Sequence, residues 1–524
     1  MVTARVVPRG RRQARRSSSA GAPLAPGTAW AMRRRRPSFG CARCRQAGSH
    51  APEAPSKGDG RPRLGALVAG RRARTHPATA GPAAARGPAG LSLPSPTATA
   101  SQALGAPRLG SRAMSAIAFH LPDELQDVLA DLEAFLATEV IARHEKHADL
   151  LEDPRRLYDE DGRHSAPAQQ LIREVRQASS AAGFFNLSVP PSIGGRGLGY
   201  LAYYSAWELA NRTCGPRNWL GTFALSHWAF GPSAVLEQVT DEARERFLPG
   251  LLAGDTSMCF GLSEPGAGSD AAALTTRAEP DGDGWRVHGR KIWTTNVTFA
   301  DWMVVFAVTD AERAARRRGG ISAFLVPTDA PGFRLDRVIR MHGHIGGVEG
   351  ETVLDGVPVE PWQLVGPLDD GLRIGLLGVS LGRVYNSARS VGLARWSLEK
   401  AIAYAKDRVA FGQPIADYQG VSFPLAESAM QVHAAHLMGL NVAQLLDQGG
   451  RAVKELSMTK AFSVEVCLRA VDRAIQTHGA RGFVNEEGLV EAYNTLRLIN
   501  VADGTNEILR RTIFQQLAKG DLDL

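Results

Sequence analysis

A turn-rich segment at residues 263–270 carries groups suited to holding an anion. It reads Ser-Glu-Pro-Gly-Ala-Gly-Ser-Asp, and glycines allow backbone N–H groups to approach a bound anion closely. The hydroxyl of Ser269 could donate a hydrogen bond to a phosphate. The segment lacks the Lys-Ser/Thr pair of a P-loop, and its composition also suits a plain surface turn. An anion site and a surface turn therefore remain alternatives at this point.

A second segment, residues 291–296, places a tryptophan beside two threonines. Trp293 could offer a flat face to a planar heterocycle, and the hydroxyls of Thr294 and Thr295 could hydrogen-bond to it. The indole would equally suit packing within a strand. The residue types alone leave both interpretations open.

A carboxylate, Asp503, stands directly before Gly504-Thr505 and the last helical run of the chain. Aspartate is a favoured N-cap because its carboxylate accepts hydrogen bonds from the free N–H groups of a first turn. A buried carboxylate beside a substrate can instead accept a proton. Asp503 is therefore a helix cap or a general base.

The elements that must position these groups form a helical, then a β-rich, then a second helical region. Helices are expected from residue 121, over 168–182, over 201–211, and over 241–254 with a break at Pro249. The first helix has one apolar face, formed by Leu125, Val128, Leu129, Leu132, Leu136 and Val140.

The pattern changes near Thr256. Residues 285–289, 302–308 and 321–326 are short alternating or apolar runs, which favour strands. The arginine- and glycine-rich stretch 311–320 is expected to be an exposed loop.

Helical periodicity returns after residue 371, with long apolar stripes joined by short loops, as in an antiparallel bundle. One stripe is Ala434, Leu437, Met438, Val442 and Leu445; another is Val464, Leu468, Val471 and Ile475. The chain is thus predicted to be an α+β protein with a helical domain at 114–255, a β domain at 256–365 and a helical bundle at 366–524.

The formal net charge of +8 divides unevenly along the chain. Residues 1–113 hold 21 Lys and Arg against two acids, a net charge of +19, and residues 114–524 carry −11. The first part has no helical or alternating periodicity and too little apolar surface to fold. It is a mis-assigned translation start, an organelle transit peptide or a basic tail for nucleic acid.

Cysteine usage agrees with a reducing compartment. Cys41 and Cys44 have no second pair to complete a zinc site, so no metal is expected. Cys214, Cys259 and Cys467 are isolated and are interpreted as small apolar core residues. No apolar stretch is long enough for a membrane span.

In order and spacing, five segments resemble the acyl-CoA dehydrogenase family of flavoenzymes, and the resemblance covers residues 121–524. Two are the segments at 263–270 and 291–296; the others are Arg-Val-Ala-Phe-Gly-Gln-Pro-Ile at 408–415, Gln-Thr-His-Gly-Ala-Arg-Gly-Phe at 476–483 and Asp-Gly-Thr-Asn-Glu-Ile at 503–508.

The resemblance implies an N-terminal helical domain, a middle β-barrel and a C-terminal four-helix bundle, with FAD between barrel and bundle in a homodimer or homotetramer. By position it implies FAD contacts from Leu262, Ser263, Ser269, Trp293, Thr295 and Thr505. It also implies contacts to the FAD of a neighbouring subunit from Arg408, Phe411, Gln419, Gln476 and Gly479. Family members commonly have a second glycine at the position of Ala480 and Asn at that of Arg481, so this chain departs from the pattern there.

The implied reaction is the α,β-dehydrogenation of an acyl-CoA thioester to the 2-enoyl-CoA, which needs a buried carboxylate base. Most members have Glu directly before Gly-Thr, where this chain has Asp503, one methylene shorter. The alternative base position on the first bundle helix is Gly382, which has no side chain. Asp503 is therefore expected to be the base, as in the branch that uses aspartate, with Ser269, Arg383 and Gly504 on the substrate side.

The expected electron acceptor is an electron-transferring flavoprotein, and the acidic body argues against nucleic acid as a partner. The location is predicted to be a bacterial cytoplasm, or the mitochondrial matrix if the leader is a transit peptide. An acyl-CoA oxidase, a related flavin monooxygenase and a non-catalytic acyl-CoA- or flavin-binding scaffold remain alternatives.

Overall fold

The computed structural model describes residues 120–341 and 343–523. The predictions for residues 1–113 lie outside this part of the chain. Among the described residues, no helix combines the length and the apolar character needed to cross a bilayer.

The N-terminal region is helical, as predicted. Its helices are α1 (Asp123–Phe135), α2 (Ala142–Lys146), α3 (Ala148–Leu151), α4 (Pro154–Leu157), α5 (Ala166–Ala181), α6 (Gly199–Cys214), α7 (Asp241–Arg246) and α8 (Leu248–Ala253). A π-helical turn, Leu136–Ile141, joins α1 to α2, and the predicted apolar stripe faces the core along them. The predicted break lies at Phe247, with Pro249 in the first turn of α8, and Gly254 ends that helix in the left-handed region at φ 80°.

The middle region is an eight-stranded sheet with the hydrogen-bonded order β6-β7-β3-β2-β4-β5-β8, in which β1 pairs with β4. The strands are β1 (Met258–Gly261), β2 (Arg277–Asp281), β3 (Gly284–Thr295), β4 (Trp302–Val308), β5 (Ile321–Pro327), β6 (Phe333–Val338), β7 (Glu349–Val359) and β8 (Leu364–Val365). The predicted β domain is confirmed, and its strand order begins at β6 and ends at β8.

Both faces of the sheet are covered at β4, which is why its sequence is a continuous apolar run. Val304 and Phe306 pack in one core with N-terminal helices and the start of the bundle. Met303 and Val305 pack on the opposite face with residues of β3 and β7. At β4, one face of the sheet thus packs against the helices, and the other lies within the β domain.

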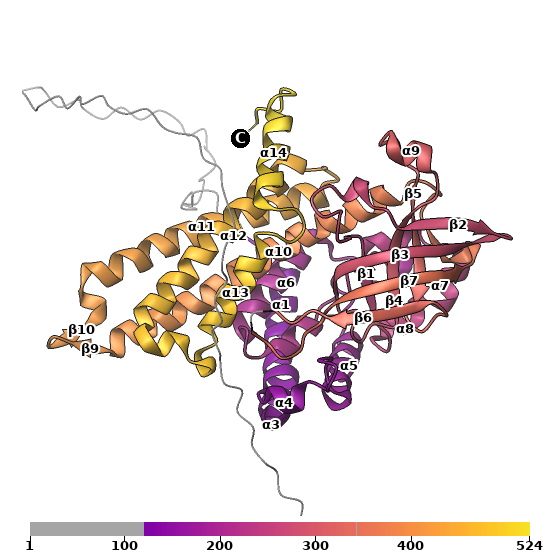
Figure 1. The fold of residues 1–524 in the computed structure, drawn as a ribbon. Coiled ribbons are helices and arrows are strands. Elements are labelled where there is room, and N and C mark those ends of the chain that lie inside the picture. The colour runs from indigo at the N-terminus through magenta and orange to yellow at the C-terminus, as the bar shows by residue number, and fades with distance from the viewer. Residues whose placement is uncertain (1–119, 342, 524) are drawn as a thin grey trace, which may run out of the picture. The chain divides into compact units, whose positions relative to one another are not determined.

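The C-terminal region is a helical bundle with antiparallel neighbours (Figure 1). It contains α10 (Gly371–Asp407), α11 (Gln419–Asp447), α12 (Val453–His478), α13 (Leu489–Ile499) and α14 (Asn506–Leu517), with a hairpin of β9 (Val409–Ala410) and β10 (Gln413–Pro414) between α10 and α11. α10 is about 55 Å long at the α-helical rise. It begins against β5, where a Cβ on Gly371 would lie 2.4 Å from the backbone nitrogen of Ala323.

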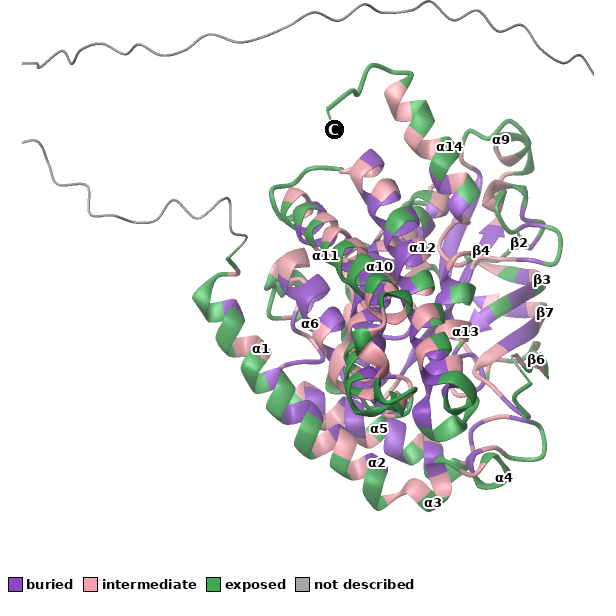
Figure 2. Ribbon diagram, turned by 90° about the vertical axis from the view of Figure 1, so that its left-hand side faces the viewer, coloured by how far each residue is buried: buried purple, intermediate pink, exposed green. Residues whose placement is uncertain are grey.

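α10 lies in the interior of the molecule, between α6 and the other bundle helices (Figure 2). Val384, Tyr385 and Ala388 join the core of the N-terminal helices. The buried carboxylate of Glu208 on α6 pairs with Arg395 of α10 and, at 2.7 Å, with His436 of α11. The N-terminal domain and the bundle therefore share one interior.

Two local predictions are wrong. The stretch 311–320 is not only a loop, because it contains the short helix α9 (Ala311–Ala315), whose first turn is capped by the Asp310 carboxylate. The predicted stripe on α11 is wrong at Leu437, which is 41% exposed, whereas Val442 of the same stripe is buried. The buried residues of that helix are Leu425, Ser428, Val432, Ala435, Gly439, Leu440, Val442 and Ala443. The stripe predicted on α12 and the burial of the three cysteines are confirmed.

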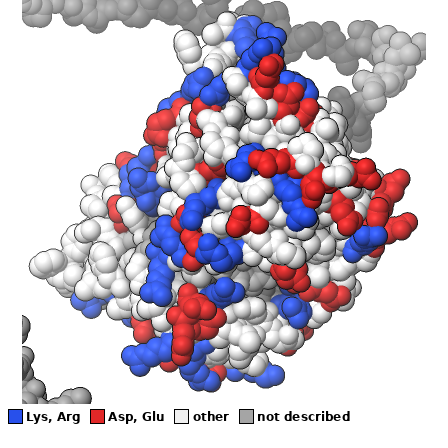
Figure 3. Space-filling model, turned by 45° about the vertical axis from the view of Figure 1, so that its right-hand side comes forward, with Lys and Arg blue, Asp and Glu red and all other residues white. Residues whose placement is uncertain are grey.

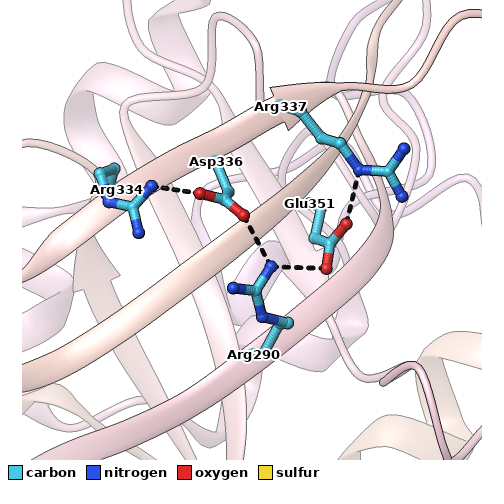
Figure 4. Close-up of polar contacts among 5 residues, drawn as sticks. All are labelled: Arg290, Arg334, Asp336, Arg337 and Glu351. Atoms are coloured by element: carbon cyan, nitrogen blue, oxygen red, sulfur yellow. Dashed lines mark hydrogen bonds and ion pairs between the residues drawn. The ribbon is translucent and has the colours of Figure 1, made fainter.

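Charged side chains on the middle sheet tie β3, β6 and β7 together (Figure 4). Arg290 of β3 lies 2.7 Å from both Asp336 of β6 and Glu351 of β7, and Arg337 of β6 lies 2.7 Å from Glu351. Glu351 is buried, but Arg290, Arg337 and Asp336 are exposed, so solvent screens these pairs and they add little to stability. Their charges also protect β6, an end strand, from pairing with another chain.

Basic and acidic side chains are interspersed over the face shown in Figure 3. They do not gather there into one basic region of the kind that binds a nucleic acid backbone.

Candidate active site

The turn-rich segment 263–270 is fixed to β3 by a buried ion pair. Lys291 Nζ lies 2.8 Å from Glu264 Oε1, and both side chains are buried. The Glu264 carboxylate also accepts from the N–H and hydroxyl of Thr275 and from the N–H of Thr276. Ile292 N–H donates to Ser263 O at 3.0 Å. The two segments that the sequence pointed to are therefore side by side.

The pKa values of this pair follow from its burial and its partners. Burial alone would raise the pKa of the Glu264 carboxyl, but the Lys291 ammonium and the threonine donors outweigh it and lower that pKa to about 2. Burial lowers the pKa of Lys291 to about 8, against the attraction of Glu264. The pair is ionised at neutral pH.

Glu264→Gln is expected to cost about 3–5 kcal/mol of unfolding free energy at pH 7, because a buried ammonium loses its counter-ion. Without Glu264 the pKa of Lys291 falls further, so the loss should shrink as pH rises from 7 to 9 and the amine becomes neutral. Denaturant unfolding at both pH values measures this. Asp270→Asn, which breaks the exposed Asp270–Arg317 pair of the same segment, is the matched control. An equal loss in the two variants would contradict the prediction.

Trp293 does not pack into the core. Its side chain is 57% exposed, and its backbone lies in the left-handed region at φ 59°. A bulky residue rarely adopts this conformation, and such strain concentrates at binding sites. Thr295 is exposed beside it, on the same face of β3. The pair presents a ring and a hydroxyl to the exterior of the β domain.

Most of the remaining residues of segment 263–270 are exposed, although Ala267 is buried. Leu262 is half-buried against α10, where a Cβ on Gly375 would lie 3.7 Å from its Cδ1. Ser269 is exposed, and a Cβ added to Gly266 or Gly268 would meet nothing within 4 Å. An exposed ring, a hydroxyl and an uncovered glycine backbone fit a flavin nucleotide, which combines a planar heterocycle with phosphates.

The candidate base, Asp503, lies between α13 and α14 and faces α10. Its Oδ2 accepts a hydrogen bond of 2.7 Å from Asn386 Nδ2. Arg383 Nε donates to the backbone oxygen of Asp503 at 3.1 Å. Burial raises the pKa of Asp503 to about 6, against the opposing charges of Lys460 and Arg383.

The cap interpretation of Asp503 is wrong, because Thr505 is the N-cap of α14. Thr505 Oγ1 accepts from the N–H of Ile508 at 3.3 Å. The carboxylate of Asp503 is thus left for another role. Lys460, which is buried, holds the loop by donating to Gly504 O at 3.0 Å and to Asn506 Oδ1 at 3.1 Å.

The backbone of this loop explains why a short acid suits it. Asp503 has φ 52° and Gly504 has φ 92°. Aspartate and asparagine tolerate the left-handed region better than most residues. The carboxylate reaches the space above Gly382, where a Cβ would lie 2.1 Å from Asp503 Oδ2. The missing side chain on α10 therefore provides the room for Asp503.

A second group of predicted residues lies at the opposite end of the bundle. Phe411, in the β9–β10 hairpin, is 96% exposed with φ 51°. The other four members are exposed as well: Arg408, Gln419, Gln476 and Gly479. Tyr404 stacks on His478 at 4.5 Å and joins the ends of α10 and α12 that carry them. Arg481 is paired with Glu487 at 2.5 Å.

Within one chain the two groups are far apart. At a rise of about 1.5 Å per residue, Asp407 lies about 36 Å along α10 from Arg383. Figure 1 shows β9 and β10 at one end of the bundle and the middle sheet beside the other. Within one chain, three sets of predicted residues therefore lie together. They are Leu262 and Ser263; Trp293 and Thr295; and Asp503, Gly504 and Thr505 beside Arg383.

Sequence reasoning missed five residues at this site. Asn386 could have been found, because it stands one helical turn after Gly382 on the same face of α10. Glu264 and Lys291 lie 27 positions apart, and no sequence pattern shows that they meet. The same holds for Lys460 and for Trp228, whose Nε1 lies 2.6 Å from the position that a Cβ on Gly382 would take.

Three family models together match most of the chain. The N-terminal domain of acyl-CoA dehydrogenase matches residues 122–255, the middle domain residues 259–357 and the C-terminal domain residues 369–518. The chain belongs to the acyl-CoA dehydrogenase family. The predicted fold, enzyme class and cofactor, FAD, are thereby confirmed at the level of this family.

Named relatives of this acyl-CoA dehydrogenase-family chain come from bacteria and mitochondria. The human mitochondrial short-chain specific acyl-CoA dehydrogenase is 33% identical over 68% of this chain and 84% of its own length. A subunit of the caffeyl-CoA reductase–Etf complex of Acetobacterium woodii is 31% identical over 67% of this chain and 91% of its own. The structure of glutaryl-CoA dehydrogenase from Mycobacterium smegmatis with FADH2 aligns with a TM-score of 0.64 and 26% identity, over 76% of this chain and 95% of that one.

Proposed function

We propose that the chain catalyses the α,β-dehydrogenation of an acyl-CoA thioester to the 2-enoyl-CoA, with Asp503 as the base. The observation that carries this proposal is the placement of Asp503, a half-buried residue whose carboxylate meets Asn386 of α10 at 2.7 Å and whose pKa is raised to about 6 by desolvation. A base of this pKa is ionised at neutral pH and still strong enough to take a weakly acidic proton.

The chain's own residues would divide the work as follows. Asp503 takes the α-proton on a carboxylate oxygen, while a backbone N–H beside it, at Gly504, donates to the thioester carbonyl as negative charge develops there. Arg383 supplies positive charge next to the base, and Ser269 lies on the substrate side of the cofactor. FAD, when bound, supplies the acceptor for the hydride that leaves Cβ. The electrons of the breaking Cα–H bond then form the new double bond.

The same exposed groups support a cofactor site shared by two subunits. In one subunit, Leu262, Ser263, Ser269, Trp293, Thr295 and Thr505 would hold FAD. From the neighbouring subunit, Arg408, Phe411, Gln419, Gln476 and Gly479 would complete the site in a homodimer or homotetramer. Their exposure and their distance from Asp503 along α10 support this division.

An electron-transferring flavoprotein is the proposed acceptor, in line with the Etf complex to which one relative belongs. That relative is named a reductase, and the same site can work in reverse, because a protonated Asp503 can return its proton to Cα. A bacterial cytoplasmic location, with the mitochondrial matrix as the alternative, stays a prediction.

The test is an acyl-CoA panel of varied chain length and terminal group, added to the FAD-loaded protein under nitrogen. At least one thioester should bleach the visible flavin band and give the 2-enoyl-CoA. An unchanged flavin band with thioesters that demonstrably bind would favour the scaffold alternative. Rapid reoxidation by oxygen with stoichiometric peroxide would favour the oxidase.

A further inference from the structure

One face of α10 is shaped around the carboxylate of Asp503. Gly378 and Gly382 stand one turn apart, and the indole of Trp228 lies directly on them. A Cβ on Gly378 would lie 2.5 Å from Trp228 Cε3, and one on Gly382 would lie 2.6 Å from Trp228 Nε1. Asn386 stands one further turn along the same face, and it is 4% exposed.

One N–H donor of this face reaches the carboxylate of Asp503, and the indole N–H of Trp228 borders the same space. Asn386 Nδ2 donates to Asp503 Oδ2 at 2.7 Å. The space above Gly382 is bounded by that same Oδ2, at 2.1 Å from the Cβ position, and by Trp228 Nε1, at 2.6 Å from it. Among the described residues, Trp228 Nε1 is buried without a hydrogen-bond acceptor, and an indole nitrogen can only donate.

The charged and titratable groups around Asp503 come from three helices. Arg383 and Tyr385 lie on α10, Lys460 on α12, and Tyr203 on α6. Both cations are bound to backbone oxygens of the loop, Arg383 to that of Asp503 and Lys460 to that of Gly504. No hydrogen bond from either reaches the carboxylate of Asp503 among the described residues, so the direct side-chain donor is Asn386.

We propose that Asn386 is a positioning residue, which holds the carboxylate of Asp503 ionised and aimed while Trp228 closes the space beside it. The inference rests on the proposed role of Asp503 as the base. The side chain of Asp503 is one methylene shorter than that of glutamate, and its backbone lies in the left-handed region. The direction of its carboxylate is therefore set by the groups of α10 that it contacts. A hydrogen bond to the ionised form favours that form.

The sign of the expected pH effect follows directly. Removing the Asn386 donor leaves the burial of Asp503 in place and takes away a contact made to its carboxylate. The pKa of Asp503 should then rise, so the rate of flavin reduction should reach its plateau at higher pH. A hydrogen bond to a charged group corresponds to about one to two pH units.

The test is the pH dependence, between pH 5 and 9, of flavin reduction under nitrogen by an acyl-CoA that the wild type oxidises. Asn386→Leu keeps the side-chain volume but removes the donor. The rising limb of its rate–pH profile should therefore move to higher pH by about one to two units. Asn386→Asp keeps the shape but adds a second carboxyl, so its limb should move further. A fall in rate at every pH with an unmoved limb in both FAD-loaded variants would overturn the positioning role.

Asp503→Asn in the same assay separates this inference from the proposed function. If Asp503→Asn reduces flavin as fast as the wild type, the base assignment fails, and the inference fails with it. If Asp503→Asn is slow and both Asn386 variants keep the wild-type limb, the base stands and only the positioning role is lost. Trp228→Phe, which keeps a ring on the two glycines without an N–H, should shift the limb less than Asn386→Leu.

Discussion

Asp503→Asn is expected to leave a folded, FAD-containing protein that binds acyl-CoA and reduces its flavin 10²–10⁴-fold more slowly, the usual share of a general base. Asparagine keeps the size of the side chain and tolerates φ 52° as well as aspartate does. The loop should therefore stay in place, and the loss would report on the proton acceptor. Rapid mixing with acyl-CoA under nitrogen measures the rate, and isothermal titration of acyl-CoA provides the control for binding.

The wild-type rate should depend on pH in a matching way. The pKa of Asp503 is raised to about 6 by burial, and only the ionised form can accept the α-proton. The rate should therefore rise with pH through about 6 and stay level above it. In Asp503→Asn this limb should disappear, and a limb that persists near pH 6 would assign the base to another group.

Gly382→Ala is expected to slow flavin reduction about 10²-fold, although alanine in a helix interior is about 1 kcal/mol more favourable than glycine. The added methyl group would lie 2.1 Å from Asp503 Oδ2 and 2.6 Å from Trp228 Nε1. The carboxylate must move, and a displacement of about 1 Å from a productive geometry is enough for such a loss. Circular dichroism and FAD content should match the wild type.

A double-mutant cycle makes this prediction specific. In the Asp503→Asn background the base is already gone, so adding Gly382→Ala should cost little more. Losses that multiply in the double variant would mean that the methyl group acts through the fold or through another part of the site.

The fold could be predicted from the sequence because its signals are local. The apolar stripe that starts at Leu125 and the apolar run at 302–308 each indicate, by their own residue pattern, which side chains are buried. On α11 the pattern misled, because exposed Leu437 and buried Gly439 reverse the usual sorting by side-chain type. Glycine is buried there because the Tyr204 ring occupies the place of its side chain, a contact that only the folded chain shows.

The candidate site could be predicted only as a set of residues. Trp293 and Asp503 were singled out by type and position, but their left-handed backbones are set by tertiary context, and no single-residue preference reveals them. The Glu264–Lys291 pair joins two segments that the sequence presents separately. In the sequence Asn386 is an ordinary polar residue of a long helix, and only the fold places the loop that carries Asp503 against it.

The length of α10 has a consequence for how this protein keeps its cofactor. A single helix carries Arg383 beside the loop of the proposed base and ends at the exposed hairpin proposed to serve another subunit's FAD. Occupancy of the cofactor site would then depend on the protein concentration, because only associated subunits form the complete site. On dilution, FAD should be released as subunits separate, and the midpoint of thermal unfolding should fall with protein concentration. Excess FAD should oppose both effects, so that cofactor supply and assembly regulate one another.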